Sequence, residues 1–373
     1  MFIIQQKDFD SLISALKTRS YLVIGPTVRD NAVVYDEINA ASDLPIGWTD
    51  EQDNSQYRLK RTTNGSFFGT SVGPYSWKRF LFPPRLKILS ITKRGKALEI
   101  ESDEPGERRR QYAFLGVRPC ELSAIALQDK VFMDAQFSDR AYTVRRNGAF
   151  VVAVNCTRSG GTCFCTSMGT GPDAKEGYDI VLTEIVEKDQ HYFVAEVGSA
   201  KGTDVMNDVP RTKASAAEIQ LARKLVETAR ENMKKTMNAK GLRELLSENA
   251  ESTHWDEVSR RCLMCANCTL VCPTCFCSTI EDTTDLSGEH AERWRRWDSC
   301  FTMDFAKVTG GNFRPSTRAR YRQWITHKLS SWIDQFGTSG CVGCGRCITW
   351  CPVGIDITAE VQALRNNGVR AEA

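Results

Sequence analysis

Cysteines are the residues of this chain whose spacing is best suited to chemistry. The chain has 373 residues and 15 of them are cysteine. Two runs share one form, with cysteines at C-x2-C-x2-C-x3-C and a proline directly after the last one. The first run is Cys262, Cys265, Cys268 and Cys272, and the second is Cys341, Cys344, Cys347 and Cys351. The closely spaced thiolates of a run can wrap one iron-sulfur cubane, while the last one, a further turn along the chain, points away from it.

In two-cluster ferredoxins, the last cysteine of each such run binds the other cluster. Carried over to this chain, the pattern predicts two 4Fe-4S clusters with exchanged ligands. One set is Cys262, Cys265, Cys268 and Cys351, and the other is Cys341, Cys344, Cys347 and Cys272. A zinc site or buried structural thiols are the alternative, but structural zinc usually takes its ligands as two pairs across a loop. The repeated pattern ending in Cys-Pro therefore favours iron-sulfur clusters.

Four further cysteines precede these runs, and four is the number that a cubane needs. They are Cys120, Cys156, Cys163 and Cys165. Cys120 follows an expected strand and opens an expected helix, whose N-terminal dipole favours a thiolate. Cys156 ends the apolar run AFVVAVNC, and the other two lie in a glycine-rich turn. A third 4Fe-4S cluster and a set of buried, redox-inert thiols are both open at this point.

The sequence Thr-Cys-Phe-Cys occurs twice. In an extended segment, residues i and i+2 share a face, so Cys163 and Cys165 can address one metal while Phe164 packs on the apolar side. In the second copy, Cys275 and Cys277 come directly after the first run has closed, so we expect them to pack against the ferredoxin clusters. Cys300 is left without an assigned role.

The chain has the length of two or three domains, at roughly 100 to 200 residues each. Residues 1–205 alternate short β-rich runs with Gly, Pro and Asp turns and one helical stretch at 122–132, which predicts an α+β or α/β domain. Residues 206–254 are expected to form a helical linker with a capping box at Ser215 and Glu218. Residues 255–373 are expected to form an α-helical ferredoxin domain. Its aromatic residues recur at helical spacing between Arg318 and Phe336.

Composition and charge exclude several classes. No apolar run approaches the roughly 20 residues of a membrane-spanning helix, and the N-terminus lacks the order of a secretory signal. A cysteine-dense chain of this kind is expected in the cytoplasm, with its thiols reserved for metal. The formal charge of +3 gives no long-range attraction to nucleic acid. The segments ERWRRW and RARYRQWITHK mix arginine with aromatics, but we expect helical spacing to gather those aromatics into a buried stripe.

The chain offers no convincing nucleotide-binding loop and no catalytic residues. GTGPDA at 169–174 matches the dinucleotide pattern G-x-G-x-x-A, but it follows a cysteine loop instead of a strand and contains a proline. The sequence also lacks the paired C-x-x-C motifs that a nickel-iron active site requires. The cysteine runs therefore predict a protein that carries electrons for another subunit.

Motifs spread over nearly the whole chain resemble one family. They include YLVIGPTVRDNAVVYDEI, FFGTSVGPYSWKRFLFPP, GVRPCEL, CFCTSMGTGP, CPTCFCS, GGNFRPS and GCVGCGRCITWCPVGID. These segments are similar to the β (iron-sulfur) subunit of soluble heterotetrameric nickel-iron hydrogenases of the sulfhydrogenase type, which couple hydrogen to NAD(P). An iron-sulfur subunit of anaerobic sulfite reductase belongs to the same family.

The resemblance implies an electron-transfer subunit with several partners. These are the small and large subunits of a nickel-iron hydrogenase and a flavin- and NAD(P)-binding subunit, with neither nucleic acid nor membrane among the expected partners. The sulfite reductase subunit is the near alternative. A stand-alone redox-sensing or nucleic-acid-binding iron-sulfur protein is a third, from a different class.

Overall fold

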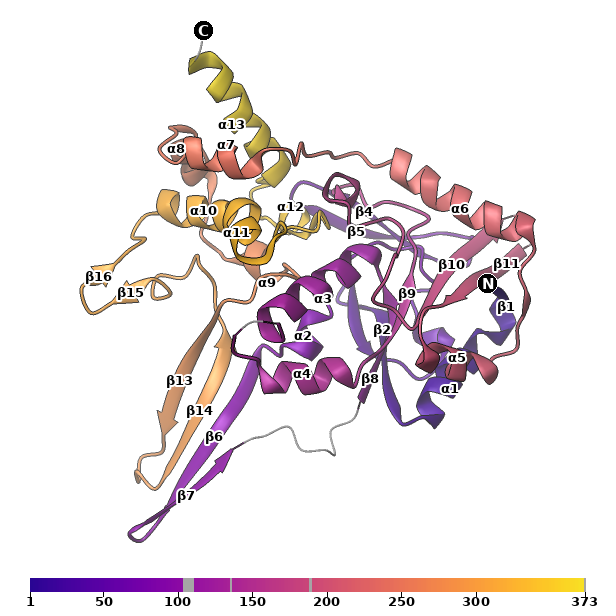
Figure 1. Cartoon of the computed structure of the whole chain (residues 1–373), viewed down its shortest axis with the longest axis horizontal. Helices are drawn as coiled ribbons and strands as arrows, with labels where there is room; N and C mark the ends of the chain where they lie inside the picture. Colours follow the sequence, from indigo (N-terminus) through magenta and orange to yellow (C-terminus); the bar gives the residue numbers. More distant parts are fainter. Residues whose placement is uncertain (103–110, 135, 188–189, 372–373) are drawn as a thin grey trace.

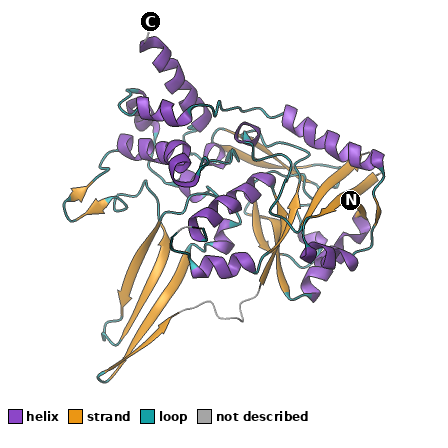
Figure 2. Cartoon of the chain, viewed as in Figure 1, coloured by secondary structure: helices purple, strands orange, loops and turns teal. Residues whose placement is uncertain are grey.

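A large sheet with helices on both faces stands beside a group of helices in Figure 1. This computed structural model describes residues 1–102, 111–134, 136–187 and 190–371. Figure 2 shows that strands dominate the N-terminal region, whereas helices surround the cysteine runs near the C-terminus. The expected fold class, a mixed α/β region followed by a helical dicluster region, is confirmed. No helix in the described part of the chain combines the length and the apolar character needed to cross a bilayer.

The large sheet has the strand order β12-β1-β11-β10-β9-β8-β2-β3. Its strands are β1 (Phe2–Gln5), β2 (Tyr21–Arg29), β3 (Ala32–Glu37), β8 (Gln111–Val117), β9 (Phe150–Val154), β10 (Ile180–Glu187), β11 (Gln190–Val197) and β12 (Thr212–Lys213). Strands β10, β9, β8 and β2 run parallel, and the outer neighbours pair antiparallel. Central parallel strands are covered on both faces, which explains why β9 reads as the unbroken apolar run FVVAV.

Helices cover both faces of this sheet. Those on one face are α1 (Phe9–Thr18) and α5 (Ala200–Asn207); those on the other are α2 (Lys78–Leu81), α3 (Pro119–Phe132), α4 (Arg140–Asn147) and α6 (Ala216–Glu231). Short 3-10 turns are η1 (Gln6–Asp8), η2 (Ala41–Asp43) and η3 (Cys165–Met168). The expected helix at 122–132 is confirmed as part of α3. The capping box before α6 is also confirmed, because the Glu218 backbone N–H donates to Ser215 Oγ at 3.3 Å.

The helical group around the cysteine runs packs on aromatic residues. Its helices are α7 (Leu242–Glu248), α8 (His254–Arg261), α9 (Asn267–Leu270), α10 (Thr317–Thr326), the π-helix η4 (His327–Ser331), α11 (Trp332–Phe336), α12 (Arg346–Thr349) and α13 (Ile357–Ala371). The aromatic stripe expected between 318 and 336 is confirmed, because Tyr321, Trp324 and Trp332 are buried. Gly337 ends the stretch in the left-handed conformation, at φ +70°.

A second, antiparallel sheet joins distant parts of the chain. It has the order β13-β14-β6-β7, with β6 (Arg85–Arg94), β7 (Ala97–Ser102), β13 (Ser278–Thr284) and β14 (His290–Trp297). Its strands extend away from the helices as an arm (Figure 1). The segment ERWRRW lies on strand β14, so the expectation of helical spacing there is wrong. Two hairpins complete the fold, β4 (Trp48–Asp53) with β5 (Gln56–Arg61) and β15 (Lys307–Val308) with β16 (Gly311–Asn312).

Candidate metal centres

The first thiol pocket lies between α8, α9 and the end of the second cysteine run. It contains Cys262, Cys265 and Cys268, together with Cys351 from the other run. The chain can make this tight loop because Met264 and Ala266 adopt left-handed backbone conformations, at φ 51° and 64°. The last cysteine of the second run therefore lies with the first run, as the exchanged pattern requires.

The walls of this first pocket suit an iron-sulfur cluster. Tyr321 and Trp324 line the pocket, and in the described residues the Tyr321 hydroxyl and Trp324 Nε1 are buried without a hydrogen-bond partner. The backbone N–H of Ile355 donates to Cys351 Sγ at 3.3 Å. Donors of this kind satisfy cluster sulfur atoms and influence cluster potential. Burial raises the pKa of Cys268 well above its usual value, so a bound metal would have to displace that proton.

The second thiol pocket is formed by Cys341, Cys344 and Cys347, and Cys272 comes to it from the first run. The Cys272 thiol is close enough to all three to raise their pKa values, although burial is the larger cause in each. Both expected ligand sets are thus brought together across the two runs. Cys268 also raises the pKa of Cys347, which indicates that the two pockets are neighbours.

A buried lysine lies against the second pocket. Lys328 Nζ donates to Cys272 Sγ at 3.2 Å and to Thr274 Oγ1 at 3.0 Å. Burial alone would lower the pKa of Lys328, but the nearby thiols raise it well above its usual value. A charged ammonium in this position offsets the negative charge of thiolates or of a cluster.

The remaining N-terminal cysteines converge on a third thiol group beside Cys344. Burial raises the pKa of Cys163 to about 12, and the Cys156 and Cys344 thiols contribute to that rise. The Cys163 thiol donates to the Cys344 carbonyl oxygen at 3.8 Å. The neighbours that raise the pKa of Cys120 include Cys165 and Cys344. Strand end, helix start and glycine-rich turn therefore meet where the sequence left two interpretations open.

Phe164 lies between the paired cysteines of this turn and packs into the helical group. Its side chain is buried in the same apolar cluster as Trp324 and Ile348. The Phe164 backbone N–H donates to the Gly343 carbonyl at 2.8 Å. The opposite placement of the cysteines and Phe164 matches the alternation of an extended segment. The turn is therefore fastened to the second cysteine run.

Glycines in the second run permit this close approach. A Cβ on Gly343, which has φ +63°, would lie 2.7 Å from Cys165 Cα, and a Cβ on Gly345 would lie 2.4 Å from the Thr162 carbonyl. Both contacts are too short for any other residue without a backbone shift. Gly171 has the same role inside the turn, since its Cβ would lie 3.1 Å from Cys165 Sγ.

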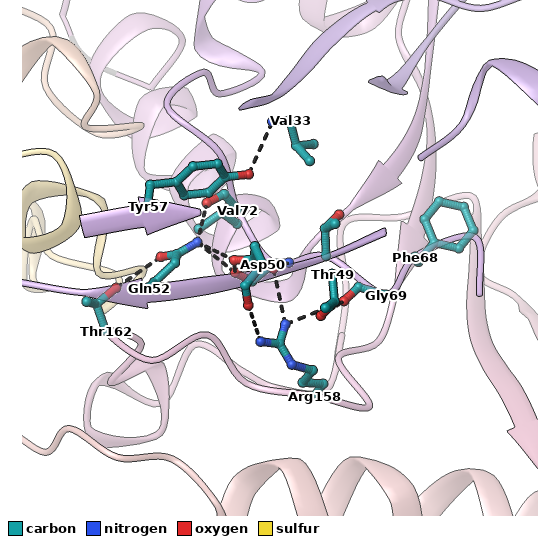
Figure 3. A network of polar contacts seen from close by, with 12 residues as sticks. Val33, Thr49, Asp50, Gln52, Tyr57, Phe68, Gly69, Val72, Arg158 and Thr162 are labelled. Carbon is teal, nitrogen blue, oxygen red and sulfur yellow. Dashed lines mark hydrogen bonds and ion pairs between the residues drawn. The ribbon is translucent and has the colours of Figure 1, made fainter. Parts of the chain in front are cut away.

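A polar network also fastens the turn (Figure 3). Buried Asp50 accepts from Gln52 Nε2 at 2.7 Å and pairs with Arg158 at 3.1 Å. The Gln52 side-chain oxygen accepts from Thr162 Oγ1 at 3.1 Å and from Thr349 Oγ1 at 3.0 Å. Thr162 comes directly before Cys163, and Thr349 lies between the last two cysteines of the second run. The network therefore fixes the third thiol group relative to the second pocket.

Charged residues beside these pockets were not identified from the sequence. Arg346 is buried, lowers the pKa of Cys344, and pairs with Glu121, the residue after Cys120. Arg118 lowers the pKa of Cys156 and donates to the Phe68 carbonyl at 2.7 Å. In each case the sequence signal was a charged residue close to a cysteine in an apolar segment, as in GVRPCEL and GCGRC.

No three His, Cys, Asp or Glu side chains converge on a point that could hold a single metal ion, within the residues the structure describes. A cubane differs from a single ion because each thiolate binds its own iron, so the sulfur atoms surround a volume instead of meeting at one atom. The three remaining cysteines, Cys275, Cys277 and Cys300, lie beside the second pocket near Lys328.

The fold and these thiol pockets define an iron-sulfur protein of the electron-transfer class. Residues 261–355 match the 4Fe-4S dicluster domain, which implies two 4Fe-4S clusters. The chain is 30% identical over 351 residues to sulfhydrogenase 2 subunit beta of Pyrococcus furiosus, and the match covers 92% of each chain. The chain belongs to the family of this protein, and it is an iron-sulfur electron-transfer subunit related to it.

Proposed function

We propose that the chain is the electron-relay subunit of a bidirectional NAD(P)-linked nickel-iron hydrogenase. The observation that carries the proposal is the order of the thiol groups. Cys268 of the first pocket lies beside Cys347 of the second, and Cys344 of the second lies beside Cys163 and Cys165 of the third group. Bound 4Fe-4S clusters supply one-electron redox chemistry. Such a row connects the ferredoxin region to the N-terminal region.

The ligand sets are part of this proposal. In the first pocket they are Cys262, Cys265, Cys268 and Cys351; in the second, Cys341, Cys344, Cys347 and Cys272. A third cluster is held by Cys120, Cys156, Cys163 and Cys165. The convergence of these last four thiols beside Cys344 supports the third site over the alternative of inert buried thiols.

The protein residues hold the clusters, exclude water and set the charge around them. Arg118 lies beside the third group, Lys328 beside the second pocket, and Arg346 between the two. Each cation is buried, and buried positive charge favours the more negative, reduced state of a neighbouring cluster. These positions support electron transfer toward the N-terminal region.

The partners follow from the family. The relative is named as part of a sulfhydrogenase, which implies partner subunits for this chain. We infer that these are the hydrogenase small and large subunits and a flavin- and NAD(P)-binding subunit, together forming a heterotetramer. A cytoplasmic location belongs to the same proposal, because a reducing compartment keeps ligand thiols free. The division into residues 1–205, 206–254 and 255–373 also remains a proposal, and the sheet formed by β6, β7, β13 and β14 joins its first and last parts.

Purification of the complex from its native host tests this function. Nickel and a flavoprotein that accompany the chain in constant ratio are the expected result. Siroheme in place of nickel would instead assign the chain to an anaerobic sulfite reductase. A chain that purifies alone, with its clusters intact, would point to the stand-alone redox-sensing or nucleic-acid-binding class.

A further inference from the structure

Cys277 and Cys300 are brought together by the end of a strand pair. Strands β13 and β14 pair antiparallel up to Ser278 and Trp297, and the Asp298 backbone N–H continues the ladder to the Cys277 carbonyl at 2.9 Å. The chain then turns so that the two thiols hydrogen bond to each other. The Cys300 backbone N–H also donates to the Cys277 sulfur. Neither cysteine belongs to the proposed ligand sets, and neither forms a disulfide in the structure.

This pair lies between ligands of the first two pockets. Cys300 is close enough to Cys268 for that thiol to raise its pKa. On the other side, Cys277 lies near Cys275, whose thiol hydrogen bonds to Cys272. A continuous row of sulfur atoms therefore runs from a ligand of the first pocket to a ligand of the second.

The surroundings of the pair are positively charged. Lys328 lowers the pKa values of both Cys277 and Cys300, and Asp298 is the acidic group that opposes it at Cys277. Lys78 donates to the Cys275 carbonyl at 3.1 Å, and its Nζ lies 3.9 Å from the centre of the Trp297 ring. Purely structural thiols usually lie in apolar surroundings, whereas reactive ones lie beside cations and remain partly accessible. Both cysteines are only partly buried.

We propose that Cys277 and Cys300 form a redox-active dithiol–disulfide pair that exchanges two electrons with the adjacent 4Fe-4S centres, a proposal that rests on the proposed function. On oxidation, the two S–H bonds break, one Sγ–Sγ bond forms, two protons leave and two electrons pass singly to the cluster oxidants. On reduction, two electrons from the same centres and two protons restore the thiols. Hydrogen and NAD(P)H both react in electron pairs, whereas a cluster carries one electron at a time, so such a pair provides a two-electron store within the relay.

The test uses the native holo-complex, poised anaerobically at a series of potentials and quenched in acid. Non-reducing digestion and mass spectrometry then report the Cys277–Cys300 linkage. The expected result is one linked peptide in oxidised samples, replaced by two free thiols in reduced samples, in a single two-electron transition. Cys277→Ser abolishes the linked peptide. The matched control Cys275→Ser leaves it in place, because Cys275 belongs to the same turn but is not a member of the pair.

Three results would overturn the inference. Free thiols at both positions at every potential, in a wild-type complex whose cluster signals are intact, would refute the pair and leave the proposed function standing. A loss of about four irons per chain in Cys277→Ser would make this cysteine a cluster ligand instead. A wild-type complex without clusters would refute the proposed function and the pair together.

Discussion

Arg346 and Glu121 form an ion pair in which both side chains are buried, and each is the sequence neighbour of a proposed cluster ligand. Glu121 follows Cys120 at the start of α3, and Arg346 precedes Cys347 at the start of α12. Glu121 also accepts from the Tyr35 hydroxyl at 2.8 Å. The pair therefore joins the third thiol group to the second pocket through one buried contact.

Glu121→Gln should destabilise the protein strongly, because it keeps the side-chain shape but leaves the Arg346 guanidinium buried without its counter-charge. Breaking a buried ion pair on one side typically costs about 3–5 kcal/mol. We expect a lower unfolding temperature under anaerobic conditions, with partial recovery in Glu121→Gln/Arg346→Met. Glu51→Gln removes an exposed pair with Lys60 and is the control, with an expected effect below about 1 kcal/mol. Equal effects of the two single changes would contradict this role of the buried pair.

Exchanged ligation predicts which cysteine substitutions resemble one another. Cys262→Ala should damage the first cluster and Cys341→Ser the second, and each should lower the iron content by about four per chain. Cys272 belongs to the first run but lies in the second pocket, so Cys272→Ser should give the low-temperature spin-resonance spectrum of Cys341→Ser. If its spectrum instead matches that of Cys262→Ala, the ligands are not exchanged. Unchanged iron in all three variants would refute the cluster assignment.

His254 makes stability depend on pH. Its Nε2 lies 2.7 Å from Glu360 Oε2, and both residues are buried, so α8 is joined to α13. The hydrogen bond to Glu360 is the largest cause that raises the pKa of His254 above 6.5. The folded state thus binds the proton more tightly than the unfolded state. The resulting stabilisation is complete below about pH 6.5 and is lost as pH rises through the folded-state pKa.

Anaerobic unfolding midpoints from about pH 6 to about pH 9 test this linkage. The wild-type midpoint should fall with rising pH over the window above 6.5. His254→Gln, which cannot take up the proton, should have a lower midpoint at the acidic end and a shallower slope. An identical slope in the variant would show that other groups cause the pH dependence.

Gly343 tests the contact between the glycine-rich turn and the second cysteine run. Gly343→Ala places a methyl group 2.7 Å from Cys165 Cα and also strains a left-handed residue, whereas Gly337→Ala has the same strain with no atom within 4 Å. We expect Gly337→Ala to cost about 1 kcal/mol. Gly343→Ala should cost more and should also lower the iron content, because the turn must move. Equal iron content and stability in the two variants would show that the turn does not pack against Gly343.

The sequence predicted features that depend on local spacing and missed those that depend on distant contacts. The two cysteine runs and the stripe of Tyr321 and Trp324 follow from periodicity alone, and the structure has the same elements. The ladder between Arg295 of β14 and Leu86 of β6 joins segments about 200 residues apart, and no local pattern specifies such pairing. The burial of Arg346 was equally hidden, because a charged residue is buried only where a partner is supplied from elsewhere in the fold.

Iron and acid-labile sulfide in the anaerobically purified full-length chain test the proposed relay most directly. Phe164 packs into the helical group, so the whole chain is a better subject than its N-terminal part. Three clusters predict about 12 irons and about 12 sulfides per chain, falling to about eight of each in Cys163→Ser. A wild-type value of about eight that is unchanged in Cys163→Ser would contradict the third cluster, and zinc in place of iron would contradict the relay as a whole.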